Sequence, residues 1–306
     1  MNDQLRGVII PVATPFDAGS DEAVDVAALE HNFGLWDGTG VAGYMVLGTN
    51  GEFKAVDDEE SRTVIKAAAA NKGDKTLIVG AGRESTRTTI SFVRSLEPWG
   101  DSIDYVSVLT PNYFAKLDDG PALADFYTAV ADASPVPILL YVAPGYANGV
   151  TVPPSVLAEL ADHPNIAGVK DTSPTMMTEY MVAAGARDDF AVMAGSLSNV
   201  MTCLAFDGPG GVVSAANYLP DECARLTDLY FNESPDAAKR YYRILSRVAK
   251  SGGGKQGVAS LKAAMNIRGY HAGAPRRPVC RVSADAESQI RQALDQGLAE
   301  LATFGA

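Results

Sequence analysis

The chain has 306 residues, of which 47% are hydrophobic and 20% charged, so it can bury a large core. Its formal net charge of −12 argues against nucleic acid or an anionic membrane surface as a partner, because both attract clustered lysine and arginine. No apolar run approaches the ~20 residues that span a bilayer, and the first residues do not resemble a signal peptide. Cys203, Cys223 and Cys280 are too widely spaced for a disulfide framework or a zinc site. We therefore predict a cytoplasmic protein.

Short apolar segments rich in β-branched residues recur along the chain, and segments with helical spacing separate them. The predicted strands are 7–13, 43–47, 76–80, 105–109, 137–142, 166–170, 190–194 and 211–214. The predicted helices between them include 25–36, 57–71, 86–96, 121–133 and 154–160. Regular alternation of strand and helix predicts a parallel sheet, and eight repeats predict closure into a (β/α)₈ TIM barrel.

After the eighth predicted strand the pattern is helical, from 220 to 304. It is interrupted by the glycine run 252–254 and by Pro275 and Pro278. We therefore predict a catalytic barrel over 1–219 and a C-terminal helical extension over 220–306.

A lysine stands at the end of the sixth predicted strand. In TIM barrels the catalytic groups lie where strands end and the following loops begin. Lys170 follows the apolar residues 166–169, and the low dielectric of a barrel mouth disfavours a charged ammonium and leaves a nucleophilic amine. The structural alternative is a lysine that is solvated or paired with Asp171.

Polar groups also follow three other predicted strands. Tyr141 ends the fifth strand and could move protons beside Lys170, although strand-end tyrosines often only pack. The turn over 48–52 has two glycines, which could let backbone N–H groups converge on an anion such as a carboxylate. The alternative is a turn with only a structural role. Tyr113 follows the fourth strand in a proline-shaped loop that could supply a second phenol or cover an edge.

Together these features match the needs of an enzyme that forms an imine. Such an enzyme requires an amine, a cradle for the carboxylate of a 2-oxo acid, and groups that relay protons. Each requirement has a candidate at a strand end. The sequence therefore predicts Schiff-base chemistry on Lys170.

The same motifs resemble those of the dihydrodipicolinate synthase and N-acetylneuraminate lyase superfamily, which are class I, pyruvate-type aldolases. The likeness spans nearly the whole chain and rests on four segments in family order: Gly48-Thr49-Asn50-Gly51-Glu52, Thr110-Pro111-Asn112-Tyr113, Tyr141-Val142-Ala143-Pro144 and Gly168-Val169-Lys170-Asp171. It implies that Lys170 forms the imine, that Tyr141 is the acid or base, and that Thr49 and Tyr113 complete the relay.

The resemblance carries further implications for binding and assembly. The backbone around Gly48, Thr49, Asn50 and Gly51 would bind the carboxylate of a small 2-oxo acid. Tyr113 would reach the site of a neighbouring subunit, because the family typically forms homotetramers built from tight dimers. We expect no cofactor and no metal, since the lysine itself serves as the electron sink.

Three departures help to separate the branches of this superfamily. The synthase branch places an arginine a few residues after the strand-end tyrosine to bind aspartate semialdehyde, whereas 142–149 contains none and Tyr146 stands about there. No arginine occurs between Arg94 and Arg187. Sialic acid lyases carry an Asp-Glu pair after the seventh strand, where this chain has Gly195-Ser196-Leu197-Ser198.

The remaining features most resemble 4-hydroxy-2-oxoglutarate aldolases and 2-keto-3-deoxy-sugar-acid aldolases. They are the loop over 48–52, Thr172, the turn 194–196 with Ser196, the segment 210–217 with Val213, and the late segment 261–265. We therefore predict a lyase that reversibly cleaves a 4-hydroxy-2-oxo acid to pyruvate, or a glyoxylate-type product, and an aldehyde. Thr172, Ser196, Val213 and Tyr146 are the predicted substrate contacts.

Several alternatives stay open at this point. A dehydratase or deaminase would use the same lysine but eliminate water or ammonia, and dihydrodipicolinate synthase would condense the imine with a semialdehyde. A binding protein that has lost catalysis would not need the retained lysine and tyrosines. A metal-dependent aldolase is disfavoured because His31, His163 and His271 fall outside the predicted strand ends.

Overall fold

The computed structural model describes residues 3–19, 21–116 and 120–304. In these ranges eight strands follow one another around a closed barrel in sequence order, so the predicted fold class is confirmed. The strands are β1 (Gly7–Pro11), β2 (Gly43–Val46), β3 (Thr76–Gly80), β4 (Tyr105–Leu109), β5 (Ile138–Val142), β6 (Ile166–Asp171), β7 (Ala191–Ala194) and β8 (Gly210–Val212). Each lies where the sequence predicts it, with ends that differ by at most two residues.

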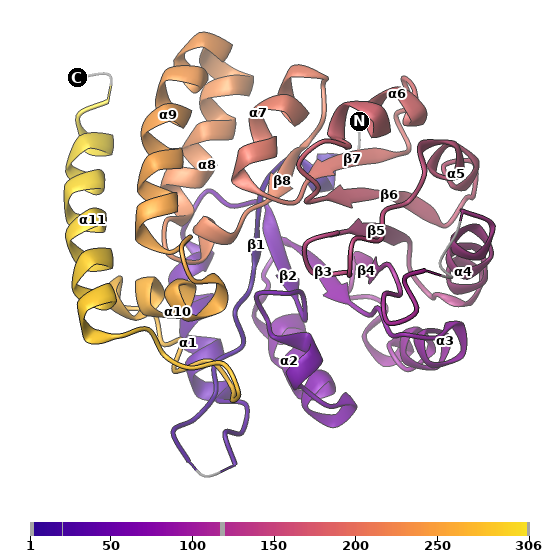
Figure 1. The fold of residues 1–306 in the computed structure, drawn as a ribbon, viewed down its shortest axis with the longest axis horizontal. Coiled ribbons are helices and arrows are strands. Elements are labelled where there is room, and N and C mark those ends of the chain that lie inside the picture. The colour runs from indigo at the N-terminus through magenta and orange to yellow at the C-terminus, as the bar shows by residue number, and fades with distance from the viewer. Residues whose placement is uncertain (1–2, 20, 117–119, 305–306) are drawn as a thin grey trace. The chain divides into compact units, whose positions relative to one another are not determined.

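The helices follow the same alternation and then continue into a C-terminal group (Figure 1). They are α1 (Val26–Asp37), α2 (Asp58–Asn71), α3 (Thr86–Arg94), α4 (Gly120–Ala133), α5 (Pro154–Leu160), α6 (Met177–Ala184), α7 (Leu197–Ala205), α8 (Pro220–Asp228), α9 (Pro235–Gly252), α10 (Gly257–Ile267) and α11 (Ala284–Ala302). The sequence prediction did not name α6 and α7. Both are short, and neither begins with a side-chain cap that would mark its start. None of the described helices is both long and apolar enough to cross a membrane.

The described residues fall into two compact units, and the first consists of 3–6 and 76–212. In this unit strands β3 to β8 pair in parallel with their neighbours in sequence. These strands are almost wholly buried, with Leu77, Val106 and Val169 fully inaccessible to solvent. Burial on both faces explains why the sequence shows continuous apolar runs here and not an alternating pattern.

The second unit consists of 7–75 and 213–304. Strands β1 and β2 pair in parallel, with Ile9 opposite Gly43. Ring contacts join Trp36 of α1 to Phe33, Tyr44 and Tyr270, so an aromatic core ties the first helix to β2 and the C-terminal segment. Helices α9 and α11 lie side by side (Figure 1). A domain boundary at residue 219 stays a prediction.

A glycine sets how closely β6 approaches β7. Gly168 lies two residues before Lys170 and opposite Ala191 in the strand register. A Cβ atom at this position would lie 2.2 Å from the carbonyl oxygen of Ala191 and 3.0 Å from its nitrogen. Because backbone atoms cannot move aside cheaply, only glycine fits between these strands.

We expect Gly168→Ala to lower the free energy of unfolding by about 2–3 kcal/mol, since the added methyl group forces the two strands apart. Gly34→Ala is the matched control, because Gly34 is exposed in α1 and an added Cβ meets nothing within 4 Å. It should raise the free energy of unfolding by about 0.5–1 kcal/mol through its helix propensity. Urea titration measures both values, and an unchanged stability of Gly168→Ala would contradict the close approach.

Candidate active site

Lys170 and Tyr141 lie side by side near the carboxyl ends of two neighbouring strands. The register places Lys170 of β6 opposite Tyr141 of β5 and opposite Met193 of β7. The ammonium nitrogen, Nζ, lies 3.9 Å from the centroid of the tyrosine ring. Both residues are buried, Lys170 at 3% exposure and Tyr141 at 4%. The structure thus brings together the predicted nucleophile and the predicted acid or base.

Burial changes the ionisation of Lys170. Loss of hydration lowers its pKa from the ordinary 10.5 to about 7, because the charged form is the one that water stabilises. A large share of the side chain is therefore a neutral amine at neutral pH, with a lone pair available to attack a carbonyl carbon. Because Lys170 is buried, the alternative of a solvated lysine at a strand end is excluded.

The turn that follows Lys170 is held by a carboxylate that sequence reasoning treated only as a possible lysine partner. Asp171 is fully buried and accepts hydrogen bonds from the backbone N–H and the hydroxyl of Ser173, both at 2.9 Å. Burial raises the pKa of Asp171, and the two bonds from Ser173 oppose that rise. The hydroxyl of Ser173 also accepts from the backbone N–H of Met176 at the start of α6. Asp171 therefore fixes the backbone on both sides of Thr172.

Thr172 packs at the junction between the ends of β6 and β7. Its hydroxyl and its backbone N–H both donate to the carbonyl of Val142, at 3.0 and 2.9 Å. Gly195 leaves room for it, because a Cβ there would lie 2.2 Å from the Cγ2 atom of Thr172. Ser196, the next residue, lies with its hydroxyl oxygen 2.8 Å from that of Ser198. Neutral hydroxyl groups thus follow both β6 and β7.

Tyr113 and Tyr146 present phenols at the surface of the same unit. Tyr113 is 75% exposed and Tyr146 63% exposed. The carboxylate of Glu84 accepts from the backbone N–H groups of Asn112 and Tyr113 at 2.9 and 3.0 Å and so holds the backbone beside this phenol. The Tyr113 ring contacts only Phe114 among the described aromatic rings, at a centroid distance of 4.9 Å. Its phenol is thus accessible to another molecule.

The loop with the sequence Gly-Thr-Asn-Gly-Glu lies in the second unit, directly after β2. Its backbone turns sharply, with Leu47 and Glu52 in the left-handed region at φ of 56° and 53°. The carbonyl of Gly51 accepts from the hydroxyl of Thr14 at 2.8 Å. A Cβ at Gly51 would lie 3.1–3.3 Å from three neighbouring atoms, so a larger residue would crowd the turn.

The loop also contacts the segment that follows β8. The Asn50 side chain donates to the hydroxyl of Ser214 at 2.7 Å. The backbone N–H of Val213 donates to the carbonyl of Ile9 at 3.0 Å, and the Val213 side chain is fully buried. The carbonyl of Thr49 accepts from the backbone N–H of Glu52 at 3.1 Å, and the carbonyl of Gly48 accepts from that of Phe53 at 3.5 Å.

Among the described residues no group of three or more histidine, cysteine or acidic side chains is placed to hold a metal ion. The predicted site residues instead offer an amine, phenols, hydroxyls and backbone N–H groups. Such a set can form an imine, bind a carboxylate and relay protons.

Comparisons with known proteins agree with the chemistry that these groups allow. The model of the dihydrodipicolinate synthetase family matches residues 4–297. The chain belongs to the dihydrodipicolinate synthetase family. A family relative in Emericella nidulans, a probable mitochondrial 4-hydroxy-2-oxoglutarate aldolase, is 33% identical over 96% of this chain and 95% of its own.

Other members of the dihydrodipicolinate synthetase family are similar over comparable lengths. The L-threo-3-deoxy-hexylosonate aldolase of Hypocrea jecorina is 28% identical, over 95% of this chain and 96% of its own. A crystal structure of a dihydrodipicolinate synthase superimposes with a TM-score of 0.86 at 26% identity, covering 97% of this chain and 99% of the other. Family membership thus supports a lyase or aldolase, and it leaves several substrates open.

The low pKa of Lys170 makes the stability of the protein depend on pH. Between the folded value of about 7 and the ordinary 10.5, the unfolded chain binds more protons at this site, so stability rises with pH across that window. We therefore expect Lys170→Met to be more stable than the wild type at pH 6, with an advantage that shrinks above pH 7 towards pH 9. Urea titrations at pH 6, 7, 8 and 9 measure the difference.

The control for this comparison is Lys66→Met, which removes a lysine exposed on α2. This variant controls for the loss of a lysine side chain at an exposed position, and the pH-dependent advantage should be specific to Lys170→Met. A pH-independent difference for Lys170→Met would mean that its side chain is solvated.

Proposed function

We propose that this protein is a class I lyase that reversibly cleaves a 4-hydroxy-2-oxo acid to pyruvate, or a glyoxylate-type product, and an aldehyde. The observation that carries the proposal is the buried Lys170, whose pKa of about 7 makes it a nucleophile, beside the phenol of Tyr141. Two relatives named as aldolases of this substrate type, at 33% and 28% identity, support it.

The proposed reaction begins with the neutral amine of Lys170, which attacks the carbonyl carbon of the 2-oxo acid. Loss of water from the carbinolamine gives a protonated imine that can accept an electron pair. A base then takes the proton of the 4-hydroxyl group and the bond between C3 and C4 breaks, so that C4 leaves as the carbonyl carbon of the aldehyde. The electron pair of that bond moves towards the imine and leaves an enamine on Lys170. Protonation of C3 and hydrolysis release pyruvate and the free lysine. Tyr141 is the proposed acid and base because it adjoins Nζ.

The roles of the remaining motif residues rest on the family resemblance. We propose that the backbone N–H groups of Thr49 and Asn50 bind the substrate carboxylate, with Gly48 and Gly51 permitting the turn. Thr49 and Tyr113 complete the proton relay. The 75% exposure of Tyr113 supports the idea that its phenol serves a neighbouring subunit in a homotetramer.

The distal end of the substrate is the least constrained part of the proposal. Thr172, Ser196 and Tyr146 offer hydroxyls, and Val213 adds an apolar contact. A neutral lining suits the hydroxyls of a 2-keto-3-deoxy sugar acid, whereas aspartate semialdehyde brings a carboxylate that an arginine usually binds. The distal carboxylate of 4-hydroxy-2-oxoglutarate could still be held by hydroxyls or backbone N–H groups. Dehydration or deamination through the same imine is the alternative outcome.

We expect purified protein to release pyruvate and an aldehyde in equal amounts from 2-keto-3-deoxy sugar acids or from 4-hydroxy-2-oxoglutarate. Lys170→Met should abolish this release, because no other group supplies the imine nitrogen. A panel of 2-oxo acids, scored for pyruvate with lactate dehydrogenase and for aldehyde by derivatisation, measures both products.

The same panel separates the rival reactions. Loss of water or ammonia without an aldehyde would show a dehydratase or deaminase. Pyruvate and aspartate semialdehyde, coupled to a reductase, test for synthase activity, and we expect a kcat/KM below that for cleavage. Condensation at an equal or higher kcat/KM would overturn the assignment.

A further inference from the structure

The last residue of the loop after β2, Glu52, is buried against the C-terminal segment of the chain. Its side chain is 7% exposed. One carboxylate oxygen, Oε1, lies 2.6 Å from Nζ of Lys262 in α10, and the other, Oε2, accepts from the backbone N–H of Arg276 at 3.0 Å. Both oxygens of Glu52 thus contact residues that follow the barrel strands in the sequence.

Lys262 has the number of partners that a buried ammonium requires. Its side chain is 1% exposed, and Nζ donates to the carbonyls of Thr14 and Ala274 at 2.7 and 3.0 Å. The carboxylate of Glu52, 2.6 Å from Nζ, is the third polar partner and forms an ion pair with the ammonium. Burial lowers the pKa of Lys262 to about 8, and the charge of Glu52 opposes that fall. The lysine therefore stays mostly charged at neutral pH and needs Glu52 as its counter-ion.

Thr14 connects this ion pair to the turn itself. Its carbonyl accepts from Lys262, and its hydroxyl donates to the carbonyl of Gly51 at 2.8 Å. The side chain is 1% exposed, so water does not compete for either bond. Thr14, in the segment that follows β1, thus links the buried Lys262 to the peptide group that precedes Glu52.

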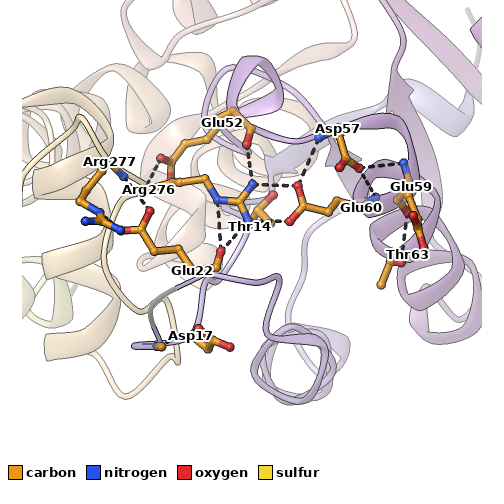
Figure 2. A network of polar contacts seen from close by, with 12 residues as sticks. Thr14, Asp17, Glu22, Glu52, Asp57, Glu59, Glu60, Thr63, Arg276 and Arg277 are labelled. Carbon is orange, nitrogen blue, oxygen red and sulfur yellow. Dashed lines mark hydrogen bonds and ion pairs between the residues drawn. The ribbon is translucent and has the colours of Figure 1, made fainter.

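Arg276 holds the other side of the same segment (Figure 2). Its guanidinium forms two hydrogen bonds to the carboxylate of Glu60 in α2, at 2.8 and 2.6 Å, and donates to the carbonyl of Ala55. The ring of Phe16 contacts both cations, with Nζ of Lys262 4.4 Å and Cζ of Arg276 4.2 Å from its centroid. The chain from Gly51 to the start of α2 is therefore fixed from several directions.

We propose that Glu52 is the positioning residue of the carboxylate-binding loop, and that Lys262, Arg276 and Thr14 form the anchor that holds it. This inference rests on the proposed function, in which N–H groups of the turn at Thr49 and Asn50 bind the substrate carboxylate. Backbone donors bind an anion well only when they converge on one point, and a small rotation of the turn separates them. None of the anchor residues is required to touch the substrate.

The test measures the pyruvate concentration that half-saturates borohydride trapping of the imine on Lys170. We expect Glu52→Gln to raise this concentration about tenfold or more, while the trapping rate at saturating pyruvate stays within about twofold of wild type. Thr14→Val, which removes only the bond to Gly51, should shift it in the same direction by less. The control Glu300→Gln, which removes an exposed carboxylate on α11, should leave the concentration unchanged.

A double variant separates positioning from stability. Glu52→Gln leaves Lys262 charged and buried without its counter-ion, so its melting temperature should fall. Glu52→Gln combined with Lys262→Met removes both charges and should regain much of that loss, yet its half-saturating concentration should stay raised because the turn is still unanchored. Recovery of wild-type half-saturation together with stability would mean that Glu52 acts only on stability, and would overturn the inference.

Two further outcomes are distinguishable. If wild type traps pyruvate on Lys170 and both Glu52→Gln and Thr14→Val half-saturate as wild type does, the anchor is wrong and the proposed function stands. If wild type forms no adduct on Lys170, the imine itself is contradicted. Should Glu52→Gln fail to fold, Thr14→Val decides the matter, since it keeps every charge of the network.

Discussion

The chemistry proposed for this protein depends on the removal of one amine from water. Lys170 lies near the end of β6 at 3% exposure, with Tyr141 of β5 and Met193 of β7 opposite it. The resulting pKa of about 7 is a cost to stability below neutral pH and the source of nucleophilicity at neutral pH. Gly168 and Gly195 allow the backbone around β7 to pack closely against β6, and Asp171 holds the turn that follows Lys170.

A second buried lysine shows that burial alone does not make a nucleophile. Lys262 is as inaccessible as Lys170, but its Nζ donates to the carbonyls of Thr14 and Ala274 and forms an ion pair with the carboxylate of Glu52. Its pKa falls only to about 8, and its lone pair appears only when those contacts are given up. Lys170 packs against the face of the Tyr141 ring, with Nζ 3.9 Å from its centroid. In the proposed mechanism Lys170 is the reactive amine, whereas Lys262 is a structural cation.

Much of the architecture could be predicted from the sequence, because strands buried on both faces produce unbroken apolar runs that are easy to recognise. Helices α6 and α7 were not predicted, because both are short and neither begins with a side-chain cap. Lys170 and Tyr141 could be named from their places at strand ends. Their contact depends on the register between β5 and β6, which includes an irregularity at Ile138 and Leu139 that no local pattern encodes.

The anchor of the loop after β2 could not be predicted for a different reason. Glu52 stands in a recognisable motif, but Lys262 and Arg276 are single charged residues in a helix and a loop far along the chain. A charged residue in a helix is ordinarily exposed, and only tertiary packing shows that Lys262 is not. The hydrogen bonds that join Thr172 to Val142 and Ser196 to Ser198 likewise depend on how the chain folds after β6 and β7, which no local pattern specifies.

The most direct test of this account is the site of covalent labelling by pyruvate and borohydride, located by peptide mass spectrometry at pH 7. The account predicts one reduced pyruvyl adduct per chain, on Lys170, with Lys262 unmodified even though its pKa is also lowered by burial. Absence of an adduct, or an adduct on Lys262 or on exposed lysines in place of Lys170, would contradict it.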